Sequence, residues 1–379
     1  MTETIFRNGR VVLPETIHDG DVVVRDGMIA EIADAGIGVA GIDLEGDWLL
    51  PGLVELHTDH IEGHYAPRPK VRWNPSAAAH AHDAQIASSG ITTVLDALRI
   101  GMDEDSQLTA EDMKILGDAI ASGQERGSLR ADHYIHLRCE VCAPDVLEGF
   151  AMFADEPLVR LASLMDHTPG QRQFTSMDTY RTYYQGKTGM SDSEFERFVA
   201  SRQARAGDLS DVHRKAIAGM CREKGIVLAS HDDATEAHVA EAADYGVALA
   251  EFPTTMEAAA ASRAAGLKVL MGAPNIVRGG SHSGNIAAGD LARAGMLDVL
   301  SSDYFPFSLL HSIFVMAETV DDVTLPAAVA LVSRNPAEAA GFTDRGAIEA
   351  GRRADLVQVR VDGDHPVVRA VWRQGRRVA

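Results

Sequence analysis

The sequence predicts an α/β protein: a (β/α)8 barrel with a small β-sandwich module built from both chain ends. Three observations predict it. Apolar runs alternate with amphipathic stretches through the middle of the chain, polar residues of similar kinds follow several of those runs, and β-type segments occur at both ends. Alternating strands and helices favour a parallel sheet, whose functional residues lie on the loops after the strands.

Composition narrows the class of protein and its partners. The 379 residues are 46% hydrophobic and 24% charged, with a formal net charge of -20, which disfavours nucleic acid and anionic membranes as partners. The start of the chain has no signal-peptide core, and no stretch approaches the roughly 20 apolar residues that cross a bilayer. Three cysteines suit reduced thiols. We therefore expect a cytoplasmic protein, and a homo-oligomer such as a dimer.

The two ends of the chain share a pattern of short strands. Residues 4–13, 21–25 and 28–33 are strand-like, and Asn8-Gly9 and Asp26-Gly27 are hairpin turn signals. Residues 354–359, 366–372 and 376–379 have the same character near the end. We expect residues 1–50 and 345–379 to form one composite β-sheet module, and residues 51–344 to form the catalytic barrel.

The barrel strands are predicted from apolar runs at 49–54, 91–96, 134–141, 159–165, 226–230, 247–252, 268–271 and 297–302. Helical stretches lie between most of them, for example 110–126, 212–224 and 236–245. The alternative is a doubly wound open sheet, but no Gly-x-Gly-x-x-Gly turn follows the first strand. The connection 166–209, with a predicted helix over 192–205, is long enough to be a lid or an insertion.

The first barrel strand ends in Glu55-Leu56-His57-Thr58-Asp59. Side chains two residues apart on a strand share a face, so His57 and Asp59 can reach one cation. A buried strand followed by a polar turn gives the same short pattern, so the prediction depends on further ligands. Four candidates follow later strands and should converge with the first two: Glu140, His167, His231 and Asp303. Nitrogen and oxygen ligands without thiolates suit one or two divalent ions, zinc first, then manganese or iron.

Basic residues follow the same strand ends. Arg68, Lys70 and Arg72 lie just after the metal motif, and Arg172 and Arg278 follow the fourth and seventh strands. Gly279, Gly280 and His282 belong to a glycine-rich loop that enters a helix predicted over 286–294. Arginine forks and free backbone N–H groups bind phosphate oxygens, although solvated arginines and a surface turn would look alike. The pattern predicts a small phosphorylated substrate.

Several of these motifs resemble the amidohydrolase superfamily over essentially the whole chain. They are His57-x-Asp59, His231, Asp303 and Gly351-x-x-Ala354-Asp355-Leu356-Val357. Two departures stand out. The sixth strand ends Glu251-Phe252-Pro253 where many members place a second metal-binding histidine, and no lysine takes the place of a carboxylated bridge. Glu140 and His167 would substitute for these ligands.

A narrower resemblance is to the phosphonate-pathway diphosphatases of that superfamily. The stretches 55–59, 67–73, 167–171 and 272–285 carry it. It implies hydrolysis of α-D-ribose 1-methylphosphonate 5-triphosphate to the 5-phosphate and diphosphate, in phosphonate catabolism. Our hypothesis is that two metal ions activate a water whose proton Asp303 accepts. The alternatives are an amidohydrolase that acts on a cyclic amide or deaminates a small molecule, and a non-catalytic barrel scaffold.

Overall fold

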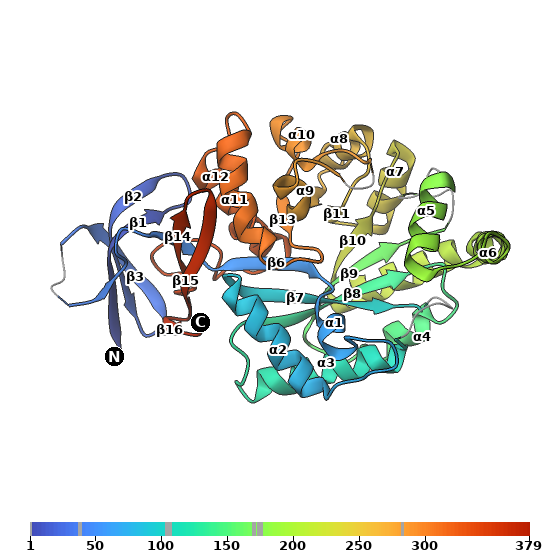
Figure 1. The fold of residues 1–379 in the computed structure, drawn as a ribbon, viewed down its shortest axis with the longest axis horizontal. Helices are drawn as coiled ribbons and strands as arrows, with labels where there is room; N and C mark the ends of the chain where they lie inside the picture. Colours follow the sequence, from blue (N-terminus) through green and yellow to red (C-terminus); the bar gives the residue numbers. More distant parts are fainter. Residues whose placement is uncertain (1, 37–39, 103–107, 169–171, 173–176, 282–283) are drawn as a thin grey trace.

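The computed structural model describes residues 2–36, 40–102, 108–168, 172, 177–281 and 284–379 (Figure 1). Two sheets organise the chain. One is a parallel sheet of eight strands wound into a barrel, and the other is an eight-stranded sheet contributed by both chain ends. The predicted fold class is confirmed. The proposed boundaries between the two parts, residues 51 and 345, stay a prediction.

The barrel sheet follows the order of the chain from its first strand to its last. Its strands are β6 (Leu53–Thr58), β7 (Ile91–Ile100), β8 (Asp132–Glu140), β9 (Val159–Met165), β10 (Val227–His231), β11 (Leu249–Glu251), β12 (Lys268–Gly272) and β13 (Val299–Ser301). A parallel bridge between Thr58 and Asp303 joins the two edges, and the Asp303 N–H donates to the His57 carbonyl oxygen at 3.1 Å. The ring is thereby closed next to the predicted metal motif, unlike an open sheet.

The two faces of the barrel wall explain the apolar runs. Strand β6 is buried at every position, because a parallel strand has side chains inside the barrel and side chains under the surrounding helices. Buried apolar side chains fill the barrel interior and pack with Phe342. They include Leu56, Leu95, Leu161, Leu249, Leu270 and Val299. Polar side chains are left for the carboxyl ends of the strands, where a barrel places its functional groups.

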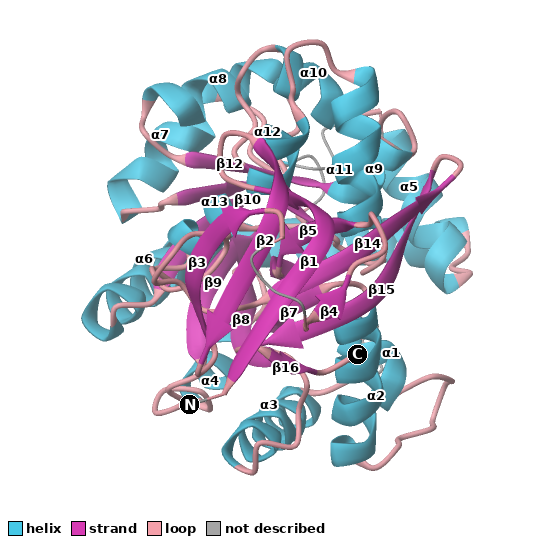
Figure 2. Ribbon diagram, turned by 90° about the vertical axis from the view of Figure 1, so that its left-hand side faces the viewer, coloured by secondary structure: helices cyan, strands magenta, loops and turns pink. Residues whose placement is uncertain are grey.

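Helices cover the outside of the barrel (Figures 1 and 2). They are α1 (Ile61–Tyr65), α2 (Pro75–Ser88), α3 (Ala110–Glu125), α4 (Val146–Ala151), α5 (Met177–Thr188), α6 (Asp192–Lys224), α7 (Glu236–Tyr245), α8 (Met256–Ala264), α9 (Ala273–Val277), α10 (Ala288–Arg293), α11 (Ser308–Thr319), α12 (Leu325–Ala330) and α13 (Arg334–Ala339). Local sequence sets several of their ends. Thr109 and Asp112 form a capping box at the start of α3, and Gly225 ends α6 at φ 66°.

Three local predictions were wrong. The helices predicted over 192–205 and 212–224 are one helix of 33 residues, α6, because the glycine-containing stretch between them does not interrupt it. Strand β7 continues to Ile100, four residues beyond the predicted end. Asn8-Gly9 is not a hairpin turn, since β1 runs through it with a register shift between Phe6 and Gly9 and Asn8 at φ 58°. This is the geometry of a β-bulge.

The second sheet faces the viewer in Figure 2. Its strands are β1 (Glu3–Val12), β2 (Ile17–Arg25), β3 (Met28–Asp34), β4 (Ile42–Asp43), β5 (Trp48–Pro51), β14 (Leu356–Asp362), β15 (His365–Arg373) and β16 (Arg376–Arg377). Asp26-Gly27 forms the predicted hairpin between β2 and β3. Strand β14 pairs with β5, so the two ends of the chain meet directly.

A cluster of ion pairs fastens the last part of the chain to the barrel. Asp132, at the start of β8, accepts from Arg345 at 3.0 Å and from Arg373 at 3.0 Å, and pairs with Arg353 at 2.7 Å. The three cysteines are free and buried. Among the helices of the described residues, none combines the length and the apolar character that a bilayer crossing needs.

Candidate active site

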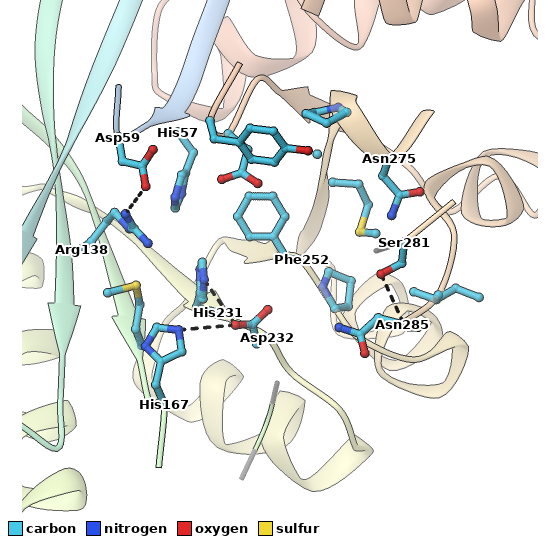
Figure 3. A pocket seen from close by; sticks show the side chains of 18 of the residues that line it. His57, Asp59, Arg138, His167, His231, Asp232, Phe252, Asn275, Ser281 and Asn285 are labelled. Atoms are coloured by element: carbon cyan, nitrogen blue, oxygen red, sulfur yellow. Dashed lines mark hydrogen bonds and ion pairs between the residues drawn. The ribbon is translucent and has the colours of Figure 1, made fainter. Parts of the chain in front are cut away.

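A cavity of about 430 Å³ lies at the carboxyl ends of the barrel strands (Figure 3). Ligand pockets are commonly of this size. Five of the six predicted ligands line it: His57, Asp59, His167, His231 and Asp303. The sixth, Glu140, is fully buried and contacts His167. The structure therefore brings together residues that lie up to 246 positions apart in the sequence.

Glu251, at the end of β11, lies beneath two of these histidines. Its Oε1 is 3.2 Å from Nδ1 of His57, and its Oε2 is 3.2 Å from Nδ1 of His231. An ionised carboxylate only accepts hydrogen bonds, so both imidazoles donate from Nδ1. Each then keeps its Nε2 lone pair. A carboxylate that fixes the tautomer in this way is the usual partner of a metal-binding histidine.

Burial keeps these imidazoles uncharged. It lowers the pKa of His231 to about 4, and burial together with the nearby charge of Arg138 lowers the pKa of His57 to about 3. The two rings stack at 5.6 Å between centroids, and both meet the edge or face of Phe252. Uncharged, packed imidazoles with a free Nε2 are suited to bind a cation.

Glu140 holds the third histidine. Its Oε1 accepts from the His167 backbone N–H at 3.0 Å, and its Oε2 lies 2.5 Å from His167 Nδ1 and 3.5 Å from an Arg99 nitrogen. Burial would raise the pKa of Glu140, but the charges and hydrogen bond of His167, with Arg99, outweigh burial and hold it well below its ordinary value. In this arrangement Glu140 orients His167 from behind, and His167 Nε2 lies 3.9 Å from Asp232.

Asp232 follows His231 directly and completes this side of the cavity. Its Oδ2 lies 3.4 Å from His231 Nε2 and has no hydrogen-bond partner among the described residues, although it is buried. Burial, with the charge of Asp233, raises its pKa to about 7. Ligand atoms of His167, His231 and Asp232 lie within 4.8 Å of one another. A buried carboxylate oxygen without a partner, beside two imidazoles, fits a cation-binding group.

Three strand ends share an unusual backbone turn. Asp232, Phe252 and Asp303, directly after β10 and β11 and just after β13, have φ values of 57°, 53° and 56°. Residues other than glycine seldom adopt this left-handed conformation, and such strain is concentrated at functional sites. It breaks the alternation of side chains that a regular strand would continue, so that neighbours such as His231 and Asp232 both line the cavity.

Asp303 lies near Asp59, because a bridge joins it to Thr58 at the end of β6. Burial, followed by the charge of Asp59, raises the pKa of Asp303 to about 7. Asp59 accepts from an Arg138 nitrogen at 3.0 Å (Figure 3). A carboxyl group with a pKa near neutrality can both accept and release a proton.

The predicted phosphate-binding residues are divided. Among the described residues, Arg278 and Gly280 line the cavity, whereas Arg68, Lys70, Arg72, Arg172 and Gly279 lie outside its lining. Arg72 contacts Asp112 at 3.3 Å, and Arg172 is buried against Asp233 and Glu241. His282 lies outside the described residues.

The long connection after β9 closes one side of the cavity. Tyr184, on α5, lines it and packs with Tyr180 and Phe195 in a small apolar cluster. From α6, Arg202 donates to the hydroxyls of both tyrosines and to the His167 carbonyl oxygen at 3.0 to 3.1 Å. The insertion therefore holds the backbone of a predicted ligand.

Sequence reasoning missed Glu251, Asp232, Arg99 and Arg138. Arg138 shares the inner face of β8 with Glu140, two positions on, so strand periodicity could have found it. Arg99 was hidden because the predicted strand stopped at residue 96. Glu251 was noticed only as a departure, and no sequence signal indicates that one carboxylate serves two distant histidines.

The fold and the site define a metal-dependent hydrolase of the amidohydrolase type. The "Amidohydrolase family" profile matches residues 211–379. The alpha-D-ribose 1-methylphosphonate 5-triphosphate diphosphatase of Escherichia coli (strain K12) is 48% identical over 376 residues, 99% of this chain and 100% of that one. The chain belongs to the family of this diphosphatase, within the amidohydrolases, and is an enzyme.

Solved structures agree on the fold. An N-acetyl-D-glucosamine-6-phosphate deacetylase from Mycobacterium smegmatis has a TM-score of 0.66 at 16% identity and covers 100% of both chains. A 5-methylcytosine deaminase from Klebsiella pneumoniae has a TM-score of 0.64 at 15% identity and covers 99% of this chain and 97% of that one. At identities this low, the likeness shows a shared architecture only, and the reaction has to be inferred from the site residues.

Proposed function

We propose that this enzyme hydrolyses α-D-ribose 1-methylphosphonate 5-triphosphate to the 5-phosphate and diphosphate, as a step of phosphonate catabolism. The observation that carries the proposal is the 48% identity to the Escherichia coli diphosphatase over the full length of both chains. The reaction adds water across a phosphoanhydride bond, and the water oxygen stays on one phosphorus while diphosphate leaves.

The donor set supports one or two divalent cations at the cavity. His57, His231 and His167 offer imidazole nitrogens, and Asp59, Asp232 and Asp303 offer carboxylate oxygens. The unpartnered Oδ2 of Asp232 and the carboxylates behind the three Nδ1 atoms fit such an ion. Nitrogen and oxygen donors favour zinc, with manganese or iron as alternatives. The chemistry supplied by a bound cation would be a lowered pKa for water and neutralised phosphate charge.

Asp303 is the proposed general base. Its side chain lines the cavity, and the backbone N–H to His57 fixes the turn that carries it. We infer that a carboxylate oxygen of Asp303 accepts the proton of the attacking water. Glu140 and Glu251 hold the imidazoles and take no part in the proton transfer, because their oxygens already accept from those rings.

Three arginines are the proposed phosphate ligands. Arg99, Arg138 and Arg278 line the cavity with the carboxylates. Arg278 is exposed at its rim, and Arg138 has a buried Nε without a partner among the described residues. Guanidinium groups bind phosphate oxygens in pairs, so they would orient a triphosphate chain and stabilise the leaving diphosphate. The phosphate-binding roles of Arg68, Lys70, Arg72, Arg172, Gly279 and His282 stay predictions. The same holds for Glu140 as a metal ligand, for a cytoplasmic location and for a homo-oligomeric state such as a dimer.

The test is diphosphate release by the purified enzyme, together with its metal content. We expect turnover of the ribose triphosphate, and much slower turnover of nucleoside triphosphates, a hydantoin and dihydroorotate. The Arg278→Ala variant should raise KM for the triphosphate, whereas Arg293→Ala, half exposed on α10 and outside the cavity lining, serves as its matched control. Turnover of a cyclic amide at a rate comparable to the triphosphate would overturn the proposal.

A further inference from the structure

A second group of histidines lies outside the barrel, where α1 packs on α2. The three imidazoles are those of His60, His64 and His82. Their ring centroids are 5.2 Å apart for His60 and His64, 5.9 Å for His64 and His82, and 6.3 Å for His60 and His82. Three imidazoles bound tetrahedrally to one ion at about 2 Å would have centroids about 5 Å apart. The observed triangle is close to that size.

One ring of this triangle, that of His82, has a buried nitrogen without a hydrogen-bond partner among the described residues. The residue is fully buried, and its Nε2 lies 2.7 Å from Asp96 Oδ1. Because the carboxylate accepts, Nε2 carries the proton and Nδ1 is left as a lone pair. That Nδ1 has no hydrogen-bond partner among the described residues. Leaving a buried polar atom unsatisfied is costly, so the site is built as if a further group were to reach it.

His64, on α1, resembles His82 in that one ring nitrogen contacts an acceptor oxygen and the other does not. Its Nε2 lies 3.0 Å from the side-chain oxygen of Gln85, on α2. That oxygen accepts, so Nδ1 of His64 is the free nitrogen. His60 stands four residues earlier, and residues four apart in a helical turn lie on one face. This spacing recurs in zinc sites, and a ligating histidine commonly donates its other N–H to a carboxylate or carbonyl oxygen.

Asp96 is held firmly enough to orient His82. Its second oxygen lies 2.7 Å from His133 Nδ1, and His133 Nε2 lies 3.3 Å from Asp83. Both nitrogens of His133 are thus occupied, and His133 cannot itself bind a metal. Asp83 accepts in addition from the backbone N–H groups of Arg130 and Ala131. The chain of contacts therefore ends at the free nitrogen of His82.

We propose that His60, His64 and His82 bind a divalent transition-metal ion of the zinc class, at a site separate from the catalytic cavity, with Asp96 and Gln85 orienting two of the three rings. None of the three lies in the lining of the catalytic cavity. The fourth position is open to water. The ion ties α1, which follows the metal motif of β6, to α2, and so stabilises the first loop of the barrel against local unfolding.

The test is zinc stoichiometry and affinity of the full-length enzyme, measured by elemental analysis and by competition with a chromophoric chelator. We expect the wild type to bind one more equivalent than His60→Ala and His64→Ala, with at least a tenfold loss of affinity at that site. His80→Ala is the matched control. His80 lies on α2 near His82, but its nitrogens contact Ser76 and Ser128.

A second readout is independent of turnover. Cobalt titrated into the metal-free enzyme should give a tetrahedral absorption band that is weaker in His60→Ala by the share of one bound ion and unchanged in His80→Ala. The partly exposed His60 can be replaced without opening a cavity, so this variant decides the question even where His64→Ala folds poorly. Equal zinc stoichiometry and affinity in the wild type, His60→Ala and His80→Ala would overturn the proposal.

Discussion

The molecule has two buried clusters of histidines and carboxylates. The interior cluster lies inside the barrel, and the wall cluster lies between the barrel strands and the helices outside them. Inside, the single carboxylate of Glu251 accepts from both His57 and His231. On the outer face of the barrel strands, the carboxylates of Asp83 and Asp96 flank the imidazole of His133, and Asp96 also accepts from His82. Both clusters are buried to the same degree, so burial alone does not distinguish them.

Their protonation states are opposite. Burial lowers the pKa values of His57 and His231 to about 3 and 4. Burial also acts to lower the pKa of His133, but Asp96 and Asp83 outweigh it and raise that pKa to about 9. The imidazoles of His57 and His231 share Glu251 and stay neutral, whereas the imidazole of His133 is held between two carboxylates whose pKa values are lowered, and it forms an ion pair. The first kind can serve catalysis, and the second fastens the fold.

The largest expected effect lies in the interior cluster. Asp303→Asn removes the proposed general base, and we expect kcat to fall about 10²- to 10⁴-fold while the protein stays folded. Diphosphate release under saturating substrate measures it, with Asp290→Asn, an exposed carboxylate on α10, as the control. Near-normal turnover by Asp303→Asn with full metal content would remove Asp303 from this role.

A substitution in the wall cluster is expected to lower the free energy of unfolding. His133→Gln leaves two buried carboxylates without their charged partner, and breaking such a pair costs about 3 to 5 kcal/mol of unfolding free energy. Urea unfolding of the metal-free protein measures the loss, and His80→Gln, on α2 with its ring against Ser76 and Ser128, should change little. A stability equal to that of the wild type would show that the ion pairs of His133 are offset elsewhere.

The stability lost in His133→Gln is expected to depend on pH, and this dependence tests whether His133 is charged. The pKa of His133 is about 9 in the folded state and has an ordinary value of 6.5, so its contribution is full below pH 6.5 and is lost as pH rises through about 9. The difference in unfolding free energy between wild type and His133→Gln should therefore shrink by about 3 kcal/mol over this interval. Unfolding in the presence of a chelator tests this, and a difference that is constant with pH would argue for a neutral His133.

The smallest expected effect concerns the shared carboxylate. In Glu251→Gln an NH2 donor replaces one of the two oxygens that face His57 and His231, so one of the two Nδ1–H groups meets a donor instead of an acceptor. We expect metal affinity at the catalytic cavity to fall about 10- to 100-fold. Competition with a chelator measures it, and Glu257→Gln, exposed on α8, is the control. An unchanged affinity would show that packing on Phe252 alone orients the two rings.

Sequence periodicity predicted most of the fold. The runs at 159–165 and 236–245 coincide with β9 and α7, because a buried strand and a capped amphipathic helix both leave local signals. Two features had weaker local signals: β7 continues to Ile100, and α6 is one uninterrupted helix. Tertiary burial can extend a strand and can stabilise a helix that contains a glycine.

The part of the candidate site that follows the ends of the barrel strands could be predicted from the sequence. His57, Asp59, His167, His231 and Asp303 all reach the cavity, since the barrel brings its strand ends together. The arginines were harder to place, because position in the sequence gives no information on which carboxylate a flexible side chain will meet. Arg72 meets Asp112, whereas Arg138, unnoticed in the sequence, meets Asp59.

The contact between the first and last barrel strands has a consequence for folding during synthesis. Glu55 on β6 accepts from the Ser301 hydroxyl at 2.7 Å and the Ser302 N–H at 2.6 Å, across 246 and 247 positions. During synthesis the first metal motif emerges long before the residues that lock it. We therefore expect hydrolytic activity to begin only once the last strand has left the ribosome and docked beside the first, because the proposed base Asp303 follows that strand.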